Sequence, residues 1–408
     1  MSQQPVLLPY ADPAFMADPF PLYRQLREDG PVRRAVLAGG LEAWLVTRFE
    51  DCLAALSDSR LSSDVRDASD PRLLERLPAT ERESMLRTML RSDPPDHTRL
   101  RRLVSKAFTA RRVAELRPRV QEITDGLLDA IVPAGKAELV EDFALPLPVT
   151  VISELLGVPV ADRDDFHRWT DDMILRGAEP PDPARIDRAW RHMRSYLTGL
   201  LQDKRARPGD DLLSALIATR DEEHQLDEDE LIAMAFLLLV AGYITTVNLI
   251  GSGIAALLAH PDQLQILRDD PELLPGAIEE FLRYDGPVNP GIARFAREDV
   301  AIAGVAIPRG ATVLVASAIA DRDPAQFPDP DRLDVTRQDN AHLAFGHGIH
   351  YCLGAPLARL EGQIAMETAL RRLPHLSLAV PPSELRWRSG GLRGPEKLPV
   401  TFTPDASS

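Results

Sequence analysis

The chain has 408 residues, of which 44% are hydrophobic, so it is long enough to bury a large core. Its formal net charge of −15 argues against a general nucleic-acid binder, and its two cysteines are too few for a disulfide scaffold and indicate a reducing, cytoplasmic compartment. The N-terminus lacks a signal-peptide pattern, and no linker or internal repeat divides the sequence. We therefore expect a single domain over residues 1–408.

The first part of the chain predicts mainly helix. Residues 18–29 carry apolar positions at helical spacing and end at Gly30-Pro31. Residues 43–58 begin as a short strand and continue as a helix. Residues 97–131 alternate apolar and basic positions at a period near 3.6, with a break around residues 108–110.

An uncharged run of 29 residues, Leu231–Ala259, raises the question of a membrane span because its length would suffice to cross a bilayer. It is the only such run, and Asp227 with Glu230 predicts a helix cap just before it. It also contains side chains that hydrocarbon would penalise, namely Thr245, Thr246, Asn248 and Ser252. We therefore expect a helix buried through the centre of a soluble protein and no membrane span.

The C-terminal part adds a minor β component. Helical patterns cover residues 211–220, 260–286 and 353–373, and strand signals occur in residues 300–320, 376–380 and 398–404. Two long irregular stretches remain, at residues 60–92 and 321–342, and such loops in a compact domain tend to be functional. The fold class that follows is mainly α with a minor β part.

The densest chemical pattern is the segment AFGHGIHYCLGAPLARLE around Cys352. Phe345 begins a glycine-rich turn that lets the backbone approach another group closely, and Gly348 is part of it. Cys352 follows at the start of a helix, where the helix N-terminus lowers the pKa of a thiol, and Gly354 removes bulk beside the sulfur. Without this context a single cysteine would be interpreted as buried filler. The context predicts a thiolate that ligates a metal or attacks a substrate.

The spacing F-x-x-G-x-x-x-C-x-G resembles the haem-ligand loop of the cytochrome P450 family, and the resemblance extends over nearly the whole chain. It implies a single cytochrome P450 fold with haem b, iron protoporphyrin IX, held between the central helix and the cysteine loop. Cys352 would be the iron ligand.

Further motifs match the same family. Glu280 and Arg283, three residues apart, share a helix face and by themselves indicate no more than a weak surface ion pair. The resemblance assigns them, with Arg332, to a buried structural network that supports the haem pocket. It also assigns cations from three motifs to the haem propionates, which charge-assisted bonds would hold. These cations are His97, Arg101, Arg294 and His350.

The middle of the uncharged run matches the oxygen-binding segment of the family's central helix. Ala241, Gly242 and Thr245 occupy the corresponding positions, and a mid-helix hydroxyl can bond the carbonyl of residue i−4. Gly242 is expected to help open a local groove. Ile244 stands where the family usually has an acid that shares proton delivery with the threonine. The usual proton route is therefore in doubt: ordered water, Thr245 or a substrate hydroxyl would have to replace it, or Ile244 only shapes the pocket.

Thr246 and the VNLI that follows it in the same helix resemble the corresponding residues of family members that tailor macrolides and other polyketides. We expect a monooxygenase that hydroxylates or epoxidises a sizeable apolar secondary metabolite, using dioxygen and two electrons. The pocket lining is expected to come from residues 60–92, 166–192 and the central helix. It would include Ile244, Val288, Asn289, Ile292 and Leu392.

The chain contains no flavin, nicotinamide or iron–sulfur motif, so the resemblance implies electrons from a ferredoxin and its reductase. We expect a monomer that binds neither nucleic acid nor membrane. Basic residues suited to docking an acidic ferredoxin are Arg102, Lys106, Arg111 and Arg112, which are equally interpretable as solvated charges.

Four alternatives stay open. Ile244 allows other oxidative chemistry, such as desaturation or phenol coupling, and a peroxide-driven relative would need no ferredoxin. A haem carrier without catalysis, or an α-helical protein with a structural cysteine and no haem, would fit parts of the pattern.

Overall fold

The computed structural model describes residues 4–75, 86–173, 182–223, 226–388 and 390–404. Its α-helices are α1 (Pro13–Ala17), α2 (Phe20–Glu28), α3 (Phe49–Ser57), α4 (Arg72–Glu75), α6 (Asp96–Ala107), α7 (Ala110–Glu115), α8 (Arg117–Ile131), α9 (Pro146–Leu156), α10 (Arg163–Met173), α11 (Pro183–Ala206), α12 (Leu212–Glu223), α13 (Glu228–Ala259), α14 (Pro261–Asp269), α15 (Leu274–Asp285), α16 (Ser317–Ala320) and α17 (Ala355–Arg372). Its strands are β1 (Val6–Leu7), β2 (Val32–Leu37), β3 (Leu41–Val46), β4 (Leu61–Ser62), β5 (Lys136–Glu138), β6 (Ile292–Ala296), β7 (Val300–Ile302), β8 (Val305–Ile307), β9 (Thr312–Val315), β10 (Ser377–Leu378) and β11 (Pro399–Thr401). The expected class, mainly α with a minor β part, is confirmed.

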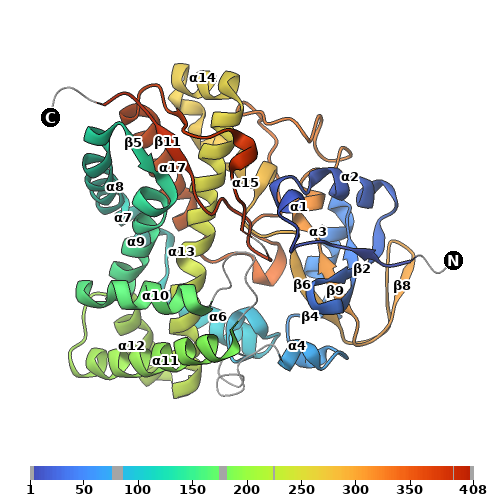
Figure 1. Cartoon of the computed structure of the whole chain (residues 1–408). Coiled ribbons are helices and arrows are strands. Elements are labelled where there is room, and N and C mark those ends of the chain that lie inside the picture. Colours follow the sequence, from blue (N-terminus) through green and yellow to red (C-terminus); the bar gives the residue numbers. More distant parts are fainter. Residues whose placement is uncertain (1–3, 76–85, 174–181, 224–225, 389, 405–408) are drawn as a thin grey trace.

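Helix α13 runs through the middle of the molecule and packs against α9, α11, α15 and α17 (Figure 1). It begins with the expected cap: the Asp227 side chain accepts from the backbone N–H of Glu230 at 2.7 Å, and the Glu230 side chain accepts from that of Asp227 at 3.0 Å. The helix is long and apolar enough to cross a membrane, but 61% of its most apolar window is buried inside the protein. Its apolar surface therefore packs against other helices.

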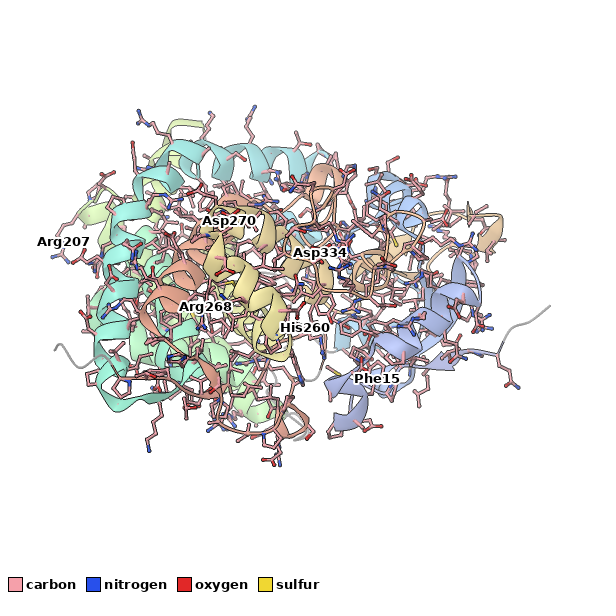
Figure 2. The ribbon with its side chains drawn as sticks, turned by 90° about the horizontal axis from the view of Figure 1, so that it is seen from above. Phe15, Arg207, His260, Arg268, Asp270 and Asp334 are labelled. Atoms are coloured by element: carbon pink, nitrogen blue, oxygen red, sulfur yellow. The ribbon has the colours of Figure 1, made fainter. Side chains whose placement is uncertain are left out.

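The largest sheet lies at the end of the molecule that also holds α1, α2 and α3 (Figure 1). Its strand order is β1-β2-β3-β9-β6-β4, and β6 pairs with β9 in antiparallel register, with Arg294 opposite Val313. Figure 2 shows Phe15 of α1 and Arg207, which follows α11, at opposite ends of the molecule. Arg294, one of the predicted propionate residues, therefore lies on β6, a strand of this sheet that is paired on both sides.

Two smaller sheets account for the other strand signals. β7 pairs with β8 in a hairpin, and β10, β11 and β5 form a three-stranded sheet. Between residues 97 and 131 the helix breaks as expected, because α6 ends at Ala107 and the Thr109 side chain caps α7 by accepting from the Arg112 N–H at 3.3 Å.

The two irregular stretches differ. Residues 321–342 contain no helix or strand. The stretch at residues 60–92 includes β4, α4 and two 3-10 turns, η2 (Val65–Asp67) and η3 (Met89–Arg91), while its residues 76–85 lie outside the described part of the chain.

Candidate active site

The cysteine loop is a tight turn that only glycine permits at two positions. Gly346 and Gly348 have φ angles of 71° and 70°, in the left-handed region. A Cβ on Gly348 would also lie 3.0 Å from the backbone oxygen of Leu56. The Cys352 N–H donates to the Phe345 carbonyl at 2.9 Å and closes the loop. The turn therefore holds the cysteine at a defined place before α17.

The environment of the Cys352 thiol differs from the expected one. The backbone N–H groups of Gly354 and Ala355 do act to lower its pKa, but burial outweighs them, so the pKa lies above its usual value in the protein alone. The helix start thus acts on this pKa in the expected direction, but desolvation of the thiolate is the larger effect. A bound cation would reverse the balance by pairing with the thiolate.

Within the described residues, no group of three or more His, Cys, Asp or Glu side chains is placed to hold a metal ion. A metal bound by Cys352 would therefore need its other ligands from a carrier group. Sulfur ligation together with a macrocycle that supplies the remaining ligands is the arrangement of thiolate haem.

Four basic side chains from three elements lie together beside this loop. The rings of His97 (α6) and His350 (cysteine loop) lie 4.3 Å apart, and His97 Nε2 is buried without a hydrogen-bond partner. Arg101, one turn after His97, donates to the Tyr351 carbonyl at 2.6 Å. Arg294 (β6) is buried and its side chain donates to the Ala293 carbonyl at 3.0 Å.

Burial and the charges of His350, Arg101 and Arg294 lower the pKa of His97 to about 4. The structure thus brings together the cations that the sequence assigned to the propionates. Two arginines beside two imidazoles, one of which has a free buried ring nitrogen, suit a ligand that carries carboxylates, and such a ligand would also favour the protonated form of His97. These residues fit haem: Cys352 would ligate the iron, and the four cations would bind the two propionates.

On α13 the expected oxygen-binding residues line an opening. Ala241 is exposed although it lies in the middle of a buried helix, and Thr245 is half-buried. The Thr245 hydroxyl donates to the Ala241 carbonyl at 3.3 Å, the expected bond to residue i−4.

Gly242 has a different role from the one expected. A Cβ there would lie 2.8 Å from both Cγ1 and Cδ1 of Ile152, so the missing side chain allows α9 to pack closely against α13. It does not open a groove toward the site.

Ile244 packs into the main hydrophobic cluster with only 8% of its surface exposed. It therefore belongs mostly to the core, and no carboxylate takes its place at this position.

The α13–α17 region contains buried polar groups whose role the sequence did not reveal. Asn248 and Ser252 follow Thr245 at i+3 and i+7 on one helix face, and their side-chain polar atoms have no partners. On α17 both carboxyl oxygens of Glu361 are likewise unpartnered, and burial raises its pKa well above the usual value. Buried polar groups of this kind are normally satisfied by ordered water. The only sequence signal was the presence of Asn and Ser inside an apolar run.

The predicted Glu–Arg network is present, with one correction. Arg283 forms two hydrogen bonds with Glu280 at 2.7 and 2.8 Å, and both side chains are fully buried. The second arginine at Glu280 is Arg337, whose Nε donates at 3.1 Å. Arg332, the residue predicted for this place, is exposed. It contributes only its backbone carbonyl, which accepts a hydrogen bond from Arg283 at 3.2 Å. The irregular segment turns back on itself, so the later arginine reaches Glu280.

The predicted pocket residues separate into two groups. Val288, Ile292 and Leu392 are half-buried, and Val288 and Leu392 form a β-bridge. Asn289 is only 1% exposed, and its side-chain oxygen accepts from the Tyr23 hydroxyl. The expectation that Asn289 lines the pocket is therefore wrong: it ties the β-bridge region to α2.

Comparisons with known proteins agree with this geometry. The model of the family "Cytochrome P450" matches residues 66–402. The chain is 52% identical over 393 residues to the cytochrome P450 monooxygenase PikC of Streptomyces venezuelae, covering 95% of this chain and 92% of that protein. It is 46% identical over 384 residues to the mycinamicin IV hydroxylase/epoxidase of Micromonospora griseorubida, covering 93% and 94%.

The solved structure of the tirandamycin C-bound P450 monooxygenase TamI superposes with a TM-score of 0.88 at 44% identity, covering 98% of this chain and 100% of that one. The chain belongs to the cytochrome P450 family and is a cytochrome P450 monooxygenase.

Proposed function

We propose that this protein is a cytoplasmic haem b monooxygenase that hydroxylates or epoxidises a sizeable, largely apolar metabolite of the macrolide or polyketide class. The observation that carries the proposal is that Cys352, exposed Ala241 and half-buried Thr245 belong to the two elements between which the family holds its haem. PikC and the mycinamicin hydroxylase/epoxidase support the substrate class because they share about half of their residues with this chain.

The protein's own residues position the reaction. Haem bound at Cys352 supplies the chemistry of dioxygen activation. Ala241 leaves space on α13, and Thr245 places a hydroxyl beside that space while remaining bonded to the Ala241 carbonyl. Half-buried Val288, Ile292 and Leu392 present apolar surface for the substrate.

Proton supply follows a route that does not use residue 244. Ile244 cannot transfer a proton, whereas Thr245, Asn248 and Ser252 form a polar stripe along α13 that contains unpartnered buried polar atoms suited to ordered water. We infer that protons reach the site through Thr245 and such water, and burial favours the protonated form of Glu361.

The electron donor is proposed to be a ferredoxin with its reductase. Ile349 and Tyr351, on either side of His350, are 50% and 39% exposed and form an apolar centre on the cysteine side. Arg102, Lys106 and Arg111 are exposed on α6 and α7, the first two after the propionate residue Arg101. An acidic partner would meet apolar contact and cations there.

A second candidate function is based on Ile244. Without an acid at this position, oxidation by desaturation or coupling, which has different proton needs, is the alternative outcome. Product analysis with the accepted substrate distinguishes it, because oxygen insertion adds 16 Da whereas desaturation removes 2 Da.

The test begins with the purified protein. Its dithionite-reduced form should bind carbon monoxide and show the red-shifted Soret band of a thiolate haem, and Cys352→Ala should lack this band. Macrolide and polyketide compounds are then screened for the optical shift that accompanies displacement of the iron-bound water. Turnover is then measured with ferredoxin, reductase and NADPH and, separately, with hydrogen peroxide alone. The comparison distinguishes a ferredoxin-dependent enzyme from a peroxide-driven one.

A further inference from the structure

The turn η3 contacts α13 at Met234. The Met89 N–H lies 3.4 Å from the Met234 sulfur, and the Ser92 hydroxyl holds the turn by donating to the Thr88 carbonyl at 2.7 Å. Met234 and Ala241 are seven residues apart, so they share a face of α13 and are separated by about 10 Å along the axis. The turn therefore lies on the same helix face as the exposed Ala241, two turns closer to the N-terminus.

Arg91, the last residue of η3, places a half-buried cation there. Burial lowers its pKa, and the only charge that acts in the opposite direction is that of Asp64. Asp64 is already occupied, because Arg66 Nε donates to its two carboxyl oxygens at 2.9 and 2.8 Å. Within the described part of the chain, no hydrogen bond or ion pair joins the Arg91 side chain to another residue. Burying a guanidinium away from water without a hydrogen-bond partner costs free energy. A bound anion would offset this cost by pairing with the guanidinium.

Arg91 is distinct from the cations that suit the propionates. The charges that act on His97 are those of His350, Arg101, Asp93 and Arg294, and Arg91 is not among them. Beside it in the sequence, Leu90 is 52% exposed and leaves apolar surface uncovered. An exposed apolar side chain and an unpaired cation are thus adjacent in a turn that contacts α13 two helical turns before Ala241.

We propose that Arg91 is a substrate-anchoring residue that binds a carboxylate on an otherwise apolar substrate, with Leu90 contacting the adjoining apolar part. The planar guanidinium can donate two parallel hydrogen bonds to a carboxylate, which a lysine cannot reproduce. The inference rests on the proposed monooxygenase function and narrows its substrate class to carboxylates, excluding amines, which Arg91 would repel.

The test uses the haem-loaded full chain and two probes, decanoate and methyl decanoate, titrated by the optical shift of the haem and by calorimetry. Wild type should bind decanoate at least about tenfold more tightly than the ester. Arg91→Gln should reduce this ratio to about one while leaving ester binding unchanged, and Arg91→Lys should retain part of it. Arg87→Gln is the matched control, because Arg87 lies four residues earlier and pairs with Asp227 at 2.7 Å; it should keep the wild-type ratio.

Three results would overturn the inference: equal binding of acid and ester by wild type, an unchanged preference in Arg91→Gln, or loss of haem from Arg91→Gln with haem retained in the control. The last would assign Arg91 to the haem carboxylates. Failure of the proposed function is separate, because it would appear as a missing thiolate-haem band in wild type, and calorimetry would still measure the preference for the acid.

Discussion

Arg337 Nε lies 3.1 Å from Oε2 of Glu280, and 57 residues of chain separate the two. Glu280 is fully buried and also accepts both hydrogen bonds from Arg283, so one carboxylate joins α15 to the irregular segment before the cysteine loop. Arg283 extends the connection by donating to the carbonyls of Asp321 and Pro330 at 2.9 and 2.8 Å. The position of the cysteine loop depends on this network.

Arg337→Ala should therefore destabilise the protein by about 1–3 kcal/mol, since it removes a charge-assisted hydrogen bond from a buried carboxylate that stays paired with Arg283. Arg332→Ala, the control, removes an exposed side chain and should change the free energy of unfolding by less than about 0.5 kcal/mol. Urea denaturation followed by haem absorbance and circular dichroism measures both variants. Equal effects would contradict the assignment of Arg337.

Gly242→Ala should lower stability by about 1–3 kcal/mol because the new Cβ would collide with Ile152. The double variant Gly242→Ala/Ile152→Ala should be more stable than the sum of the two single changes implies, since Ile152→Ala makes room for the methyl group. A thermal-unfolding cycle of the four proteins gives this coupling. Strict additivity would mean that α9 does not restrict residue 242.

Thr245→Val should reduce product formed per NADPH by at least about fivefold, because it removes the hydroxyl beside the opening while keeping the side-chain shape. The electrons lost to product should appear as hydrogen peroxide. Thr246→Val is the matched control: Thr246 is adjacent but only 2% exposed, so its coupling should match wild type. A similar loss in both variants would indicate a packing effect.

Ile244→Glu should leave product per NADPH within about twofold of wild type and lower the thermal stability. Ile244 lies in the hydrophobic cluster, where a carboxyl group would be desolvated and protonated. Ile244→Gln controls for polarity without an acid. A several-fold gain in coupling by the glutamate variant alone would show that protons limit the wild-type enzyme.

Asp321 should make stability depend on pH. Burial raises its pKa to about 7 in the folded protein, above the value of about 3.9 in an unfolded chain. Between pH 4 and 7 the folded state holds a proton that the unfolded state has released, so stability falls as pH rises through this window.

Asp321→Asn removes that titration. Its free energy of unfolding relative to that of wild type should therefore rise by about 2 kcal/mol from pH 5 to pH 8. Asp58→Asn serves as the control, because the hydrogen bonds from Arg60 lower the pKa of Asp58 and keep it ionised across this range. Urea titrations at the two pH values give the differences. Parallel pH profiles for wild type and Asp321→Asn would contradict the raised pKa.

Features encoded by neighbouring residues could be predicted from the sequence. The cap formed by Asp227 and Glu230, the helix break near residue 108 and the strand hairpin at residues 300–307 all depend on contacts within a few positions. The glycines of the cysteine loop belong to the same group, since the left-handed backbone is a local requirement. The family motifs consist of such local patterns, and they therefore indicated the family from the sequence alone.

Only the tertiary structure decided which distant side chains meet. Sequence spacing could not choose between Arg332 and Arg337, because the path of an irregular segment depends on the core beneath it. It also could not show that Asn289 bonds to Tyr23, that Gly242 serves α9, or that Glu361 is buried without a partner. The sequence by itself determined the helix through the centre, the thiolate loop and the chemistry they imply. The fold determined burial, and burial controls the partners and pKa values of the site, because both depend on segments that are far apart in the chain.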